Sequence, residues 1–204
     1  MEKKRSFSEM KKKMSFNEFN NFCKKLTEDY ANSEGHFARS YFCSNHNISE
    51  SCFYRILEHA VVTNLVDEIV FSKMLAKAKS NQKAHSSKAG GTTEIKFRRM
   101  YTERCKFIAT SIQNEEVEKV AKQYAYDLNL TKNEIARSNG LPVKVLDYVL
   151  LRSIEECIVD DDTFKAMEKR SLSGTRPEKL EYTKDFFAGL QKKRLAFKRN
   201  IKTV

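Results

Sequence analysis

Apolar residues recur at helical spacing along most of the chain. Residues 15–18, Ser-Phe-Asn-Glu, have the form of a capping box, and Phe16, Phe19 and Leu26 put apolar side chains on one face of the helix that follows. The same spacing between about 114 and 128 predicts a corresponding helix in the second half of the chain. The pattern therefore predicts amphipathic helices at comparable places in the two halves.

The apolar positions of the two halves coincide when the chain is shifted by 93 residues. Under this shift the apolar positions keep their character while the polar positions drift, as expected for one fold used twice. The matched pairs are Phe42 and Ile135, Cys43 and Ala136, Ile48 and Leu141, Cys52 and Val145, Phe53 and Leu146, Ile56 and Val149, Leu57 and Leu150, Leu65 and Ile158, Val66 and Val159, Asp67 and Asp160, Phe71 and Phe164, Met74 and Met167, and Lys77 and Arg170.

A second match, at a shift of 90, extends the repeat into the next helix of each half. It pairs Phe97, Met100, Arg104 and Phe107 with Phe187, Leu190, Arg194 and Phe197, again along one helical face. The repeating unit is therefore about 90 residues long. Asp67 and Asp160 are positioned to cap the helices that follow them.

Composition narrows the fold class to all-α. Only 6 glycines and 2 prolines occur in 204 residues, which is too few turn residues for a sandwich or a barrel. Hydrophobic residues make up 40 % of the chain, with 14 phenylalanines and 8 tyrosines, so it can build a core and wholesale disorder is excluded.

The formal net charge of +11 points to a polyanionic partner, with nucleic acid first and an anionic membrane surface second. The basic residues gather in three segments, 1–13, 77–106 and 191–204, and the rest of the chain is mildly acidic. Within the middle segment, a small and polar stretch without apolar periodicity predicts a flexible linker. The predicted organisation is a basic N-terminal arm (1–14), a first helical module (15–79), a flexible basic linker (80–95), a second module (96–175) and a C-terminal basic helix and tail (176–204).

Residues 131–150 resemble a DNA-binding helix-turn-helix. The small side chain of Ala136 allows two helices to approach closely, Gly140 can adopt the positive φ that a sharp turn requires, and Pro142 suits the first turn of the second helix. The apolar residues at the predicted helix crossing are Leu141, Leu146 and Val149.

The first copy has the same plan. Cys43 is the small residue, Asn47 takes the place of the glycine, and Ser49 can cap the second helix. One position departs from the family pattern, because the residue before the turn is usually apolar and is His46 here and Asn139 in the second copy. The apolar residues at the crossing are Ile48, Phe53 and Ile56.

Two such matches in register within a basic chain resemble tandem helix-turn-helix DNA-binding proteins of the phage or mobile-element regulator type. The resemblance implies that the second helix of each pair lies in the major groove, with Arg55 and Lys144 as donors to guanine. The implied DNA-binding residues are Ser49, Glu50, Ser51, Tyr54 and Arg55 in the first copy, Val143, Lys144, Asp147 and Tyr148 in the second, and Lys88, Arg98 and Arg99 from the basic middle segment.

The sequence gives weaker support for a metal site or a catalytic site. Cys43, His46, Cys52 and His59 suggest zinc, but their spacing does not fit a C-x2-C framework and the second copy lacks them, which favours core thiols. Three aspartates at 160–162 suggest magnesium, and helix capping accounts for them more simply. Because no phosphate loop, nucleophile elbow or acid/base pair is present, the sequence predicts neither an enzyme nor a cofactor.

The function expected from these observations is sequence-specific binding of double-stranded DNA, as a transcriptional regulator with two recognition helices. One alternative is a DNA-organising accessory protein for phage packaging, replication or conjugation. The other is a helical protein-interaction module, an inhibitor or adaptor with a basic face. The expected protein partners are RNA polymerase or another regulatory protein, with no membrane. The expected state is a monomer acting as an internal dimer, or a homodimer, in the cytoplasm.

Overall fold

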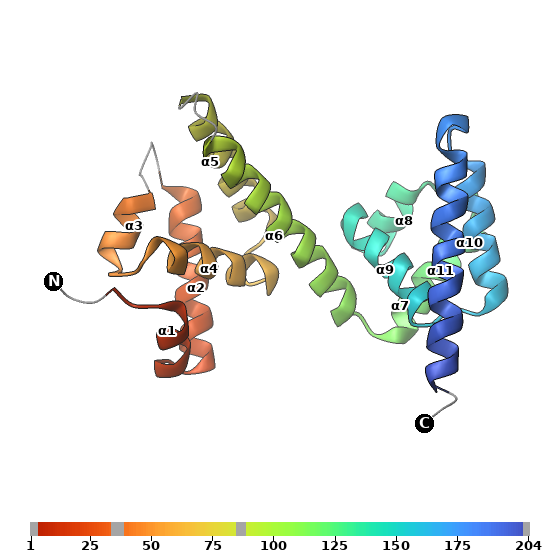
Figure 1. The fold of residues 1–204 in the computed structure, drawn as a ribbon, viewed down its shortest axis with the longest axis horizontal. Helices are drawn as coiled ribbons and strands as arrows, with labels where there is room; N and C mark the ends of the chain where they lie inside the picture. The colour runs from red at the N-terminus through yellow and green to blue at the C-terminus, as the bar shows by residue number, and fades with distance from the viewer. Residues whose placement is uncertain (1–3, 34–38, 85–88, 202–204) are drawn as a thin grey trace. The chain divides into compact units, whose positions relative to one another are not determined.

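The computed structural model describes residues 4–33, 39–84 and 89–201, and this part of the chain is all-helical, as predicted (Figure 1). In unit 1 the helices are α1 (Phe7–Lys13), α2 (Phe16–Asn32), α3 (Arg39–Asn45), α4 (Glu50–Val62), α5 (Glu68–Ala84) and α6 (Ala89–Ser111), whose last residues belong to unit 2. Those of unit 2 are α7 (Asn114–Tyr126), α8 (Lys132–Ser138), α9 (Val143–Glu155), α10 (Asp161–Ser173), the 3₁₀ helix η1 (Pro177–Lys179) and α11 (Leu180–Ile201).

The chain divides into two compact units, Met1–Phe107 and Ile108–Val204. The boundary lies within α6 because Phe97 and Met100 of that helix are buried in the core of unit 1. The sequence instead placed a linker at 80–95. Residues 80–84 and 89–95 of that stretch are helical, and residues 85–88 lie outside the described part of the chain. A segment without apolar periodicity can still be helical when the adjoining turns of the same helix are packed in a core, because most helical stability in proteins comes from that packing.

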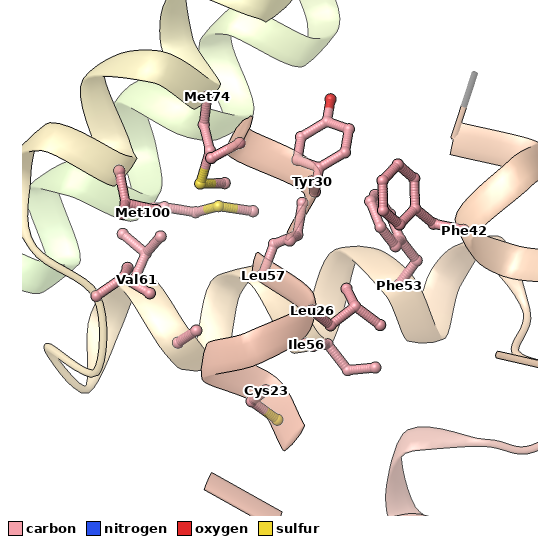
Figure 2. Packing of buried hydrophobic residues seen from close by; sticks show 14 of the residues in the cluster. Cys23, Leu26, Tyr30, Phe42, Phe53, Ile56, Leu57, Val61, Met74 and Met100 are labelled. Atoms are coloured by element: carbon pink, nitrogen blue, oxygen red, sulfur yellow. The ribbon is translucent and has the colours of Figure 1, made fainter. Parts of the chain in front are cut away.

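The core of unit 1 forms where α2 packs against α4 and α5 (Figure 2). Tyr30 of α2 meets Phe42 of α3 and Phe53 of α4 edge-to-face, with ring centroids 5.6 and 5.2 Å apart. Met74 of α5 and Met100 of α6 are buried on the other side of Leu57 in Figure 2. Edge-to-face packing suits the quadrupoles of aromatic rings and holds the three helices in one arrangement.

Part of the segment predicted as a basic arm is a helix. Ser6 and Glu9 form a reciprocal capping box that starts α1. Met10 is 3 % exposed, and the ring of Phe7 meets that of Phe19 at 5.2 Å. Residues 7–14 therefore contribute to the core of unit 1 as well as carrying charge.

In unit 2, α7 packs against α9 and α10, and α11 lies along α9 and α10. Phe187 of α11 and Phe164 of α10 have ring centroids 6.0 Å apart. Arg194 of α11 is 1 % exposed, and its guanidinium pairs with Asp161 at 2.9 Å. The C-terminal helix is thus part of the packed body of unit 2.

Lys77 and Arg170 make similar contacts in the two units. The Lys77 ammonium donates to the carbonyl oxygen of Tyr30 at 3.0 Å and lies 4.8 Å from the centroid of its ring. The Arg170 guanidinium donates to the carbonyl oxygens of Tyr124 and Asp127 and lies 4.6 Å from the Tyr124 ring centroid. Each cation donates to carbonyl oxygens near the C-terminal end of the long helix of its unit. A positive charge is favourable there because it also interacts with the negative end of the helix dipole.

α3 and α8 are each followed, two residues after their last residue, by a residue in the left-handed conformation. Asn47 has φ of 49° and Gly140 has φ of 64°, as the sequence predicted for the turn residues. The next amide donates back to the carbonyl of Cys43 at 2.9 Å in one turn and of Ala136 at 2.8 Å in the other. This Schellman pattern ends each helix sharply and sets the direction of the next.

None of the helices described is both long and apolar enough to cross a bilayer.

Candidate nucleic-acid interface

The amino-terminal end of α4 presents a group of hydroxyls. The Oγ of Ser49 accepts the backbone N–H of Cys52 at 3.1 Å, which confirms Ser49 as the cap of α4. The hydroxyls of Ser49 and Ser51 lie 3.0 Å apart, and Ser51 and Glu50 are exposed. Hydroxyls beside the positive end of a helix dipole can contact phosphate or the edges of bases.

Tyr54 lies one turn further along α4, between two cations from other helices. Arg39, the first residue of α3, donates from Nη1 to the Tyr54 hydroxyl at 2.8 Å and also pairs with Glu50. Lys96 of α6 has its ammonium 4.5 Å from the centroid of the Tyr54 ring. The sequence did not single out Arg39 or Lys96, because no motif links residues this far apart in the chain.

Arg55 is exposed on α4, with its guanidinium 4.6 Å from the centroid of the Phe7 ring of α1. The cation–π contact holds the guanidinium against this ring at an exposed position of the helix. The role of Arg55 as a donor to guanine stays a prediction.

The chain just before α1 is fastened to the turn between α3 and α4. Arg5 forms an isolated parallel bridge with Ile48, and its Nη2 donates to the carbonyl oxygen of His46 at 2.6 Å. Beside it lies a hollow of about 250 Å³, lined by Lys4, Arg39, Ser40, Cys43, Ser44 and Glu50. Two cations of the arm, Lys4 and Arg5, thus lie near the start of α4.

The predicted site residues of the basic middle segment lie on α6 or outside the described chain. Arg99 is exposed, and Arg98 pairs with Glu94 on its own helix at 2.7 Å. Lys88 lies outside the described residues.

In unit 2 the predicted DNA-facing residues of α9 lie in a different setting. Val143 is 39 % exposed, whereas Lys144, Asp147 and Tyr148 line a cavity of about 410 Å³ that α10 and α11 help to enclose. Asp147 also forms an ion pair with Lys132 of α8. Val143 and Asp147 are thus exposed and Lys144 and Tyr148 half-buried, because α11 packs along α9 and this side of α9 borders the cavity.

His46 and Asn139, each one residue before a left-handed turn residue, contact the long helix of their unit. The ring of His46 meets that of Phe22 on α2 edge-to-face at 5.7 Å. Asn139 donates from Nδ2 to Oε1 of Gln123 on α7 at 2.7 Å and to the carbonyl oxygen of Ile135 at 2.8 Å. A polar or aromatic residue is therefore accommodated there, since the long helix supplies its partner.

The residues considered for a metal site have structural partners. Cys43 and Cys52 are 5 % and 2 % exposed, and burial raises the pKa of both thiols. His59 shares a hydrogen bond with Asn20 at 2.9 Å, and burial lowers its pKa. Asp160 accepts the backbone N–H of Thr163 at 2.6 Å, as the predicted cap of α10. His59 and Asp160 thus have hydrogen-bond partners, and both thiols lie in the core.

Comparison of the chain with protein-family models, with curated proteins and with solved structures gave no match. The functional argument therefore depends on the geometry of the two helix pairs and on the charge around them.

Proposed function

We propose that this protein is a sequence-specific double-stranded DNA-binding protein, a transcriptional regulator built from two copies of one helix-turn-helix module. In this proposal α3–α4 and α8–α9 are the two helix-turn-helix motifs, and α4 and α9 are the recognition helices.

The observation that carries the proposal is that one turn geometry occurs in both units. α3 and α8 are each 7 residues long, and α4 and α9 are each 13. The left-handed residue, Asn47 or Gly140, has the same place in each turn, because it is the second residue after the first helix. This short connection with a glycine-type turn is the form in which helix-turn-helix proteins present their second helix.

Charge supports α4 as the stronger DNA-contacting helix. The cations contributed to its surroundings by the arm, α3, α4 and α6 are Lys4, Arg5, Arg39, Arg55 and Lys96. Positive groups around a recognition helix neutralise phosphates, and this supplies most of the non-specific affinity for DNA. One of these cations, Arg39, is offset by its ion pair with Glu50. On α9, Asp147, which the 93-residue shift aligns with Tyr54, is paired with Lys132. We therefore propose unequal half-sites, with the tighter one bound by unit 1.

Selection from a pool of random DNA duplexes tests this function. We expect enrichment of two half-sites at fixed spacing, with affinity for the selected site falling by orders of magnitude as salt rises. Arg55→Ala should relax the preference at one base and weaken specific binding by about 1–3 kcal/mol. Lys144→Ala should have a smaller effect in the same direction.

Lys165→Ala is the matched control, because it removes one charge from an exposed lysine of α10. If Arg55→Ala changes DNA binding no more than this control does, α4 is not the recognition helix. Salt-dependent binding without enrichment of any sequence would instead favour the DNA-organising accessory protein. An absence of DNA binding would favour the protein-interaction module.

A further inference from the structure

Unit 2 contains a partly open cavity whose apolar interior plays no part in the proposed DNA contacts. The cavity of about 410 Å³ lies between α7, α8, α9, α10 and α11, and its size is within the range of about 300–1,000 Å³ typical of small-molecule sites. Its inner wall is apolar and includes the buried side chains Leu150, Ile154, Met167, Phe187 and Leu190.

Charge is confined to one end of the lining. Lys132 and Lys144 contribute two ammonium groups and Asp147 contributes one carboxylate, which pairs with Lys132. The formal charges of these three lining residues sum to one positive charge beside an apolar interior. Such a site favours a ligand with an apolar body and one anionic group. The anionic group then neutralises the positive charge of the lining, and only the apolar body enters the apolar interior.

The cavity reflects a difference between the two units. The 93- and 90-residue shifts align Asp147 with Tyr54 and Phe186 with Lys96. In unit 1 the Lys96 ammonium lies 4.5 Å from the Tyr54 ring centroid, so a cation–π contact joins α6 to α4. A carboxylate and a phenyl ring offer no such attraction. Phe186 is 47 % exposed and lines the cavity instead of closing it.

We propose that this cavity is a binding site for a small amphipathic carboxylate, whose apolar body lies among α9, α10 and α11 and whose carboxylate meets Lys144. Lys144, Asp147 and Tyr148 both line the cavity and belong to the predicted DNA-facing side of α9. If the proposed DNA-binding function holds, ligand and DNA therefore compete for the same side chains, and the ligand lowers the affinity of unit 2 for its half-site.

Calorimetric titration of the full chain with decanoate, without DNA, tests the site independently of the proposed function. We expect one site per chain and binding at least ~10-fold tighter for decanoate than for decyltrimethylammonium, which has the same tail and the opposite charge. Lys144→Met should remove this preference, because it deletes the ammonium and keeps the apolar stem. Lys119→Met, at an exposed lysine of α7 outside the lining, should leave it unchanged.

A second set of variants fills the cavity. Leu151→Trp from α9 and Thr183→Phe from α11 should each reduce decanoate binding at least ~10-fold, and either is sufficient if the other does not fold. Equal binding of both decyl compounds, or undiminished binding to a folded, filled variant, would overturn the proposal. It would also be overturned if sedimentation showed a dimer that Phe186→Asp dissociates and that does not bind decanoate, because a second copy would then occupy the cavity.

Discussion

The backbone N–H of Arg5 donates to the carbonyl oxygen of Asn47 over 2.9 Å, which ties the N-terminal arm to the left-handed residue of the α3–α4 turn. A basic segment that composition alone describes as a charged tail is thereby held beside the start of α4. Because its backbone is bonded, the arm presents its cations to a partner with less loss of conformational entropy than a free tail would.

Replacing Arg5 by alanine should weaken DNA binding and reduce its dependence on salt. The slope of log K against log salt is expected to become shallower by about 0.9 for each phosphate that the variant no longer neutralises. Fluorescence anisotropy across a salt series measures the slope. Lys12→Ala, at an exposed position within α1, is the charge-matched control. An identical slope for the two variants would show that the position of Arg5 at the turn contributes nothing.

Gly140→Ala should destabilise unit 2 by about 1–2 kcal/mol, because alanine is strained at its φ of 64°. An added Cβ would meet no atom within 4 Å, so the cost is conformational. Gly189→Ala is the matched control within α11, where the added Cβ also meets nothing. It should stabilise the protein by about 1 kcal/mol because alanine is the better helix former. Hydrogen exchange of amides in α9 and α11 measures the stability change caused by each substitution. Equal changes for Gly140→Ala and Gly189→Ala would contradict the assigned turn geometry.

Cys157 occupies the left-handed position after α9 with φ of 55°, where Asn64 stands after α4. A side chain other than glycine or asparagine is costly there, so Cys157→Gly should raise the stability of unit 2 by about 1 kcal/mol. Differential scanning calorimetry should show a higher melting temperature. Cys157→Ser keeps the strain and should give no gain. If serine stabilised as much as glycine, the thiol and not the backbone would be the cause.

Asp161 should make the stability of unit 2 depend on pH in the acid range. Hydrogen bonds from Lys198 at 2.8 Å and from Arg194 at 2.9 Å lower the pKa of this carboxyl from its ordinary 3.8. The stabilisation is present in full above 3.8 and is lost as the pH falls through the lower, folded-state pKa.

The comparison of wild type with Asp161→Asn isolates this contribution. The variant should melt at a lower temperature near neutral pH, and the gap should close in strong acid. Asp162→Asn, whose carboxylate is 91 % exposed and pairs with Lys165 at 3.9 Å, should change little at any pH. A gap for Asp161→Asn that stays constant down to strong acid would contradict the role of its charge.

Local features of the fold were predictable where neighbouring residues determine them. Ser15 caps α2 with the predicted capping box, and Asp67 and Asp160 accept amide N–H groups at the starts of α5 and α10. The sequence placed Pro142 in the first turn of the second helix, whereas in the structure it is the residue just before α9. Caps depend on contacts three residues apart, which the sequence contains explicitly.

The partners of the candidate interface were not predictable in the same way. Arg39 and Lys96 approach Tyr54 from two other helices, and α11 turns the outward side of α9 into the wall of a cavity. No local rule relates these positions, because which helix faces meet depends on how the whole apolar surface is buried.

The sequence by itself determined the helical class, the helix caps and the left-handed turns at Asn47 and Gly140, because each follows from spacing or from the conformational freedom of a single residue. It also showed where the positive charge of +11 lies along the chain. Only the tertiary structure decided which cations surround α4, that Arg5 is tied to the turn, and that a cavity opens beside α9. These features arise from packing between helices distant in sequence, whose strength depends on burial and three-dimensional distance.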